Sequence, residues 1–129
     1  MPSLTQVRSV LAVNDLKRSV DFYRDKLGFS VELETDGWSL LVRDQVKLML
    51  GHCPNAAPAS TIGDHSWFAY VSVDGIDRCY DELKKRGVEI IQALANKPWG
   101  MREFGVVTPD GHRIVFGQDI VRDNVSAQQ

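Results

Sequence analysis

Apolar and polar residues alternate along the first half of the chain in a pattern that predicts a β-α-β-β-β unit. An apolar run at residues 7–13 predicts a strand. The apolar residues of 16–27 recur at helical spacing, and this segment lies between Asp15, a residue type that starts helices, and Gly28, which ends them. Three further strands are predicted at residues 29–34, 38–43 and 46–50.

The second half of the chain repeats this order of elements. A strand is predicted at residues 67–73, followed by a helix whose apolar stripe runs from Ile76 to Leu83 and which ends at Gly87. The sequence Val-Asn-Asp-Leu at 13–16 corresponds to Val-Asp-Gly-Ile at 73–76. Three strands are again predicted, at residues 88–93, 102–107 and 113–117.

The repeat predicts an α+β fold of two tandem β-α-β-β-β modules, which form a curled mixed sheet with a cleft. We expect a single domain over residues 1–129. Its first module covers about 5–52, a linker rich in Pro and Ala covers about 53–65, and its second module covers about 66–120. The polar tail, residues 122–129, is expected to fray.

Composition narrows the possible functions. The net charge is -2, and basic residues are interspersed with acidic ones, which argues against a nucleic-acid partner. No apolar run approaches the ~20 residues that cross a bilayer, so no membrane partner is expected. The two cysteines form no close-spaced pair, and no apolar secretory segment is visible, which favours a cytoplasmic protein.

Strand alternation assigns side chains to the two faces of the predicted sheet. Leu48 and Leu50 are expected to cover the helix, and Trp67 and Phe104 are also expected on the helix side, in the core. The side chains expected on the opposite face, where a ligand would bind, include Arg8, Met49, Phe68, Tyr70 and Glu103.

Two sequence segments resemble a known superfamily. The run from Asn14 to Tyr23, with Leu27-Gly28-Phe29, resembles the first-helix signature of the vicinal oxygen chelate superfamily. The turn at residues 108–111 resembles the second signature of this superfamily. This superfamily includes glyoxalase I, extradiol dioxygenases and bleomycin resistance proteins. The segment Pro-Trp-Gly-Met-Arg-Glu-Phe at 98–104 resembles the bleomycin resistance proteins more narrowly, and the similarity covers nearly the whole chain.

The resemblance also implies where a metal would bind. Metal-dependent members place His, Gln or Glu ligands at four strand positions, which here hold Arg8, Met49, Phe68 and Val115. None of these is a good ligand for a divalent cation, and Arg8 would repel one. We therefore expect no metal and no cofactor.

The histidines leave an alternative open. His52, His65 and His112 are interpreted as solvated loop residues, because they have no motif spacing. If they converged with Glu103, the chain would instead be a metalloenzyme of the glyoxalase or dioxygenase kind with a relocated site. Whether the chain is an enzyme is left open, with binding favoured.

Tryptophans are the main candidates for binding. The resemblance implies that Trp38 and Trp99 flank a flat heteroaromatic ring of the ligand, although both also fit a core or an interface. Glu103 suits a cationic ligand, whereas Arg8 and Arg102 suit an anionic or mixed one. The resemblance further implies a homodimer that sequesters a bleomycin-type drug or another planar compound between its subunits.

Overall fold

The computed structural model describes residues 2–120, except for the side chains of Asp64 and His65, so the predicted tail lies outside the described residues. The described chain divides into two compact units, the first ending at Pro58 and the second beginning at Ala59. No helix among the described residues is long and apolar enough to cross a membrane.

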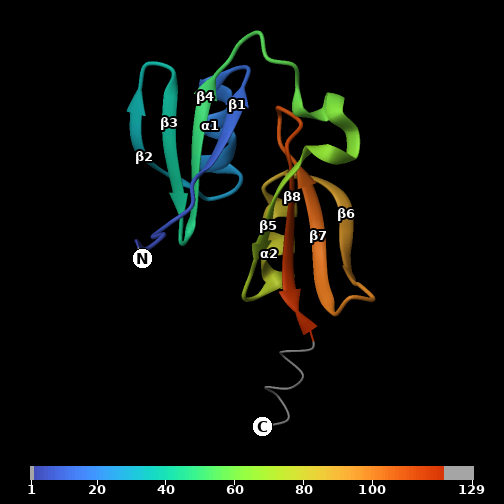
Figure 1. Ribbon diagram of the computed structural model, residues 1–129. Coiled ribbons are helices and arrows are strands. Elements are labelled where there is room, and N and C mark those ends of the chain that lie inside the picture. Colours follow the sequence, from blue (N-terminus) through green and yellow to red (C-terminus); the bar gives the residue numbers. More distant parts are fainter. Residues whose placement is uncertain (1, 121–129) are drawn as a thin grey trace. The chain divides into compact units, whose positions relative to one another are not determined.

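The first unit is a β-α-β-β-β module whose sheet has the strand order β1-β4-β3-β2 (Figure 1). Strands β1 and β4 are parallel, and the other neighbours are antiparallel. Its elements are β1 (Ser9–Val13), α1 (Leu16–Asp25), β2 (Ser30–Thr35), β3 (Trp38–Arg43) and β4 (Val46–His52).

The second unit repeats this topology, with the strand order β5-β8-β7-β6 and a parallel pair β5-β8. The second unit begins with the 3-10 segment η1 (Ala59–Ser66), which is kinked at Gly63 and occupies part of the predicted linker. The remaining elements are β5 (Trp67–Ser72), α2 (Ile76–Lys85), β6 (Glu89–Asn96), β7 (Met101–Val107) and β8 (Arg113–Asp119). The α+β class and the repeated module are therefore confirmed, as two open mixed sheets.

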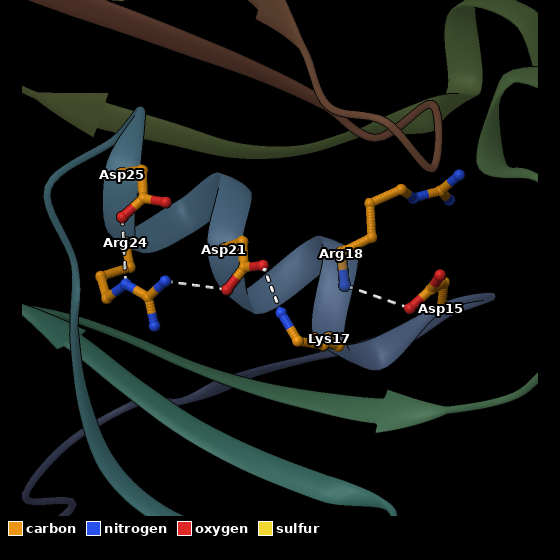
Figure 2. Close-up of polar contacts among 6 residues, drawn as sticks. All are labelled: Asp15, Lys17, Arg18, Asp21, Arg24 and Asp25. Atoms are coloured by element: carbon orange, nitrogen blue, oxygen red, sulfur yellow. Dashed lines mark hydrogen bonds and ion pairs between the residues drawn. The ribbon is translucent and has the colours of Figure 1, made fainter.

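Helix α1 begins where the sequence predicts it. The Asp15 carboxylate accepts a hydrogen bond from the Arg18 backbone N–H at 3.1 Å, which satisfies a free donor of the first turn (Figure 2). On the exposed side, Asp21 lies 3.1 Å from Lys17 and 2.8 Å from Arg24 (Figure 2). The hydrogen bond from Lys17 lowers the pKa of Asp21. The charged residues of this helix therefore mark its solvated side.

Each helix covers one face of its own sheet. The buried residues of α1 include Val20 and Tyr23, and Tyr23 makes edge-to-face contacts with Phe22 and Phe29 at 5.6 Å between ring centroids. In the second unit, Phe104 is fully buried and stacks on Phe116. The other face of each sheet carries no helix of its own module, and we call these the first and second open faces.

Candidate functional site

The first open face is apolar. Strand register places Val10, Met49, Leu40 and Leu33 in one row across β1, β4, β3 and β2. Val10 and Leu33 are exposed, and Met49 and Leu40 are half-buried. Apolar side chains gathered on a sheet surface are typical of a binding or interaction site.

Trp38 lies next to this row and directly over a glycine. Its cross-strand partner is Gly51, where an added Cβ would lie 2.8 Å from Cζ3 and 2.9 Å from Cη2 of the indole. Trp38 is 42% exposed, so a large part of the indole is accessible. Only glycine at position 51 lets the ring approach the strand this closely.

Arg8, which precedes β1, forms its hydrogen bonds and its ion pair with residues of its own unit. Its Nη1 donates to the Leu48 carbonyl oxygen at 3.0 Å, and its Nη2 lies 3.4 Å from Oε1 of Glu32. Lys47 contacts the same Glu32 oxygen at 3.5 Å. Arg8 and Lys47 therefore share one carboxylate at one end of the sheet.

A β-bulge changes the second open face from what strict alternation predicts. Trp67 pairs with Arg113 and Tyr70 pairs with Val115, so Phe68 is an extra residue in β5. Trp67 therefore lies on the open face, and the prediction of a helix-side core position for it is wrong. The Arg113 guanidinium lies 5.4 Å from the centroid of the Trp67 ring, a cation–π contact.

Phe68, the extra residue of the bulge, contacts His112 edge-to-face at 5.7 Å between ring centroids. Burial lowers the pKa of His112. Its buried Nδ1 atom has no hydrogen-bond partner within the described part of the chain. Both observations favour a neutral imidazole in the folded protein.

Tyr70 and Glu103 form a pair on the second open face. The Tyr70 hydroxyl donates to Oε2 of Glu103 at 2.7 Å. Glu103 is 5% exposed, whereas Tyr70 is 48% exposed and its ring lies over Gly117, where an added Cβ would lie 2.6 Å from Cζ. Burial of the hydroxyl, and then the hydrogen bond to Glu103, raise the pKa of Tyr70 well above its ordinary value.

Two predicted site residues lie apart from this pair. Trp99 is 65% exposed in the turn between β6 and β7, where Gly100 has a φ of 87°. Arg102 lies on the helix side of the sheet, where it contacts Asp77 of α2 at 2.8 Å and Asn96 at 3.1 Å. The structure thus places Arg102 on the opposite face from Glu103.

The residues present do not fit a metal of the superfamily's type. Arg8, Met49, Phe68 and Val115 offer no carboxylate or imidazole. Across residues 2–120, leaving aside the side chains of 64 and 65, no three His, Cys, Asp or Glu residues lie close enough to hold an ion.

The glycines beneath the aromatic rings are the structural feature of these faces that the sequence interpretation missed. Gly51 and Gly117 occupy the same position in the last strand of each module. This correspondence was visible in the sequence, since Lys-Leu-Met-Leu-Gly at 47–51 matches Arg-Ile-Val-Phe-Gly at 113–117. The bulge at Phe68 had no such signal.

The chain is thus a small α+β protein of two β-α-β-β-β modules, each with an aromatic side chain packed on a glycine of its open face. The sequence matches the model of the Glyoxalase/Bleomycin resistance protein/Dioxygenase superfamily over residues 5–116. This chain belongs to that superfamily.

Individual relatives agree with this assignment. A "Bleomycin resistance protein" of Geobacillus stearothermophilus is 33% identical over 124 residues, which cover 85% of this chain and 93% of the relative. The crystal structure of TnmS3, an antibiotic binding protein from Streptomyces sp. CB03234, has a TM-score of 0.75 at 25% identity and covers 92% of this chain and 98% of its own.

A bleomycin-binding protein from Streptomyces verticillus, crystallised with copper(II)-bleomycin, shares the fold. Its TM-score is 0.71 at 22% identity, with 90% of this chain and 97% of that chain covered.

Proposed function

We propose that this chain binds and sequesters a flat, cationic or mixed-charge antibiotic, with a bleomycin-type drug as the first candidate. The observation that carries the proposal is Trp38, an accessible indole that lies over Gly51 beside a row of apolar side chains. Such a surface suits a planar aromatic ligand. The 33% identity to a bleomycin resistance protein supports this choice of ligand.

The proposed aromatic contacts of the ligand are Trp38 and Trp99, and the further apolar contacts are Met49, Phe68 and Tyr70. The proposed polar contacts are Glu103 and Arg8, whereas Arg102 is left out because it pairs with Asp77 on the helix side. In this proposal the site is a cleft between the subunits of a homodimer, which light scattering at micromolar concentration would detect.

Titration with bleomycin, followed by tryptophan fluorescence and by calorimetry, tests the proposal. Trp38→Ala and Trp99→Ala should each weaken binding about tenfold, which corresponds to the ~1.4 kcal/mol of one aromatic contact. The control is Phe22→Ala on α1, which lies on the helix side and should leave affinity unchanged. If high micromolar drug produces no quenching and no heat, the proposal is contradicted for this ligand.

Metal independence is part of the proposal. It is supported by the side chains at the superfamily's metal positions, because Arg8 carries a positive charge and Met49, Phe68 and Val115 are apolar. Dialysis against EDTA should leave drug affinity unchanged. A stoichiometric divalent ion in protein purified without chelator would instead favour a metalloenzyme.

A further inference from the structure

Glu103 is a buried carboxylate whose partner is a neutral hydroxyl. It is 5% exposed, and within residues 2–120 its hydrogen-bond partner is Tyr70, at 2.7 Å. Removing a carboxylate from water is unfavourable unless a countercharge or several hydrogen bonds replace the lost hydration. One phenol supplies only a single hydrogen bond.

The cations nearest in sequence or register are directed elsewhere. Arg102, the neighbour of Glu103, lies on the helix side and forms its ion pair with Asp77. Arg113 of β8 lies over the Trp67 ring. Neither of these two arginine contacts involves Glu103, and within the described residues the printed partner of its carboxylate is the Tyr70 hydroxyl.

Tyr70 also exposes an aromatic surface on this side of the sheet. Tyr70 is 48% exposed, and its hydroxyl is held in place by its hydrogen bond to Glu103. It lies over Gly117, where an added Cβ would collide with the ring. Aromatic faces attract cations, and the attraction increases when the cation loses water.

We infer that Tyr70 and Glu103 form a subsite on the second open face for an organic cation, such as a protonated amine or amidine of the ligand. The cation contacts the Tyr70 ring and neutralises the Glu103 carboxylate, which the Tyr70 hydroxyl orients. This inference rests on the proposed function, and it goes further by assigning the charge of the ligand and the residues that recognise it.

A pair of planar probes that differ in charge tests the subsite. At pH 7.5, proflavine is a flat cation and acridine is its neutral analogue, and fluorescence titration gives both affinities. We expect the protein to bind proflavine about tenfold more tightly than acridine, as a buried charge-assisted contact allows. Glu103→Gln, which keeps the shape and a hydrogen-bond acceptor, should abolish this preference.

Two further variants complete the experiment. Glu89→Gln removes an exposed carboxylate at the start of β6 and should retain the preference for proflavine. Tyr70→Phe keeps the ring but removes the hydroxyl, so it should reduce the preference, and it serves if Glu103→Gln fails to fold. A full preference for proflavine in folded Glu103→Gln or Tyr70→Phe protein would overturn the inference.

Bleomycin, titrated beside the two dyes, separates this inference from the proposed function. If the protein binds bleomycin but Glu103→Gln discriminates the dyes as before, the subsite is wrong and the proposed function stands. If charge discrimination depends on Glu103 but bleomycin does not bind, the subsite stands and bleomycin is excluded. Binding of none of the three compounds would contradict both.

Discussion

The first and second open faces can be compared position by position, because their last strands align on Gly51 and Gly117. Opposite Gly51 on β3 lies Trp38, whereas opposite Gly117 on β7 lies Glu103. Both glycines are covered by an aromatic ring, but Tyr70 reaches Gly117 from β5 instead of from the cross-strand partner.

The two modules have the same backbone topology, but the side chains on their open faces differ in chemical character. The row of Val10, Met49 and Leu40 on the first open face corresponds to Tyr70, Val115 and Gly105 on the second. On the helix side both units keep large apolar residues fully buried, such as Leu50 and Phe104. Packing against the helix constrains one side of each sheet, while the open side is free to differ.

The largest expected effect contrasts the two sides of a single strand. Leu41 is fully buried under α1, so Leu41→Ala should lower the free energy of unfolding by about 2–5 kcal/mol. Leu40, its neighbour, faces the first open face and is half-buried, so Leu40→Ala should have a much smaller effect. Urea denaturation measures both, and equal losses would contradict the assignment of faces.

A smaller effect is expected at the glycines beneath the rings. Gly51→Ala places a methyl group against the Trp38 indole and should destabilise the protein by about 1–3 kcal/mol. It should also shift the emission of Trp38, measured with the other two tryptophans replaced by phenylalanine. Gly117→Ala is the matched control, because it displaces Tyr70 and should leave the Trp38 emission unchanged.

Acid should affect the second unit through His112. Its pKa is lowered by burial in the folded state, so below the unfolded pKa of about 6.5 the unfolded chain binds more protons. Stability from this residue is present above that pH and is lost as the pH falls. His112→Phe should flatten the dependence of the urea midpoint between pH 7.5 and 5.5.

The corresponding residue of the first module is Val46, which has no titratable group. Hydrogen exchange at the two pH values should therefore show the acid-dependent loss of protection in the second unit. Val46→Ala is the matched control and should lose the same protection in acid as the wild-type protein. If His112→Phe also loses as much protection as the wild-type protein, groups other than His112 cause the acid sensitivity.

The smallest expected effect concerns Arg102. Its guanidinium is paired with Asp77 on the helix side, so Arg102→Gln should change ligand affinity by no more than about twofold, as is usual for removal of an exposed ion pair. Titration with bleomycin beside Glu103→Gln measures the contrast. A larger loss in Arg102→Gln would show that Arg102 reaches the ligand after all.

Local signals predicted the elements well. Asp15 caps α1 as expected, and β3 runs from Trp38 to Arg43 as the alternation indicates. Alternation also assigned Glu103 to the open face and Phe104 to the helix side, as the structure has them. The same rule, applied to Arg102, would have placed it on the helix side, where it contacts Asp77. These features depend on neighbouring residues alone.

Other features depend on contacts that the sequence does not display. The bulge at Phe68 moved Trp67 to the open face, because one extra residue reverses the alternation on one side of it. The hydrogen bond between Tyr70 and Glu103 joins β5 to β7 across β8, and it depends on the missing side chain of Gly117. Spacing along the chain contains neither fact.

The bulges of these sheets share one location. In the described chain, the extra residues fall in β2, β5 and β6, which are edge strands, while the inner strands keep an unbroken register. An irregular edge is a poor template for another chain to extend, so bulges protect against aggregation. Under the proposed function, each site binds one drug molecule, so the protein must accumulate to the concentration of the drug, and irregular edge strands would reduce its aggregation at that concentration.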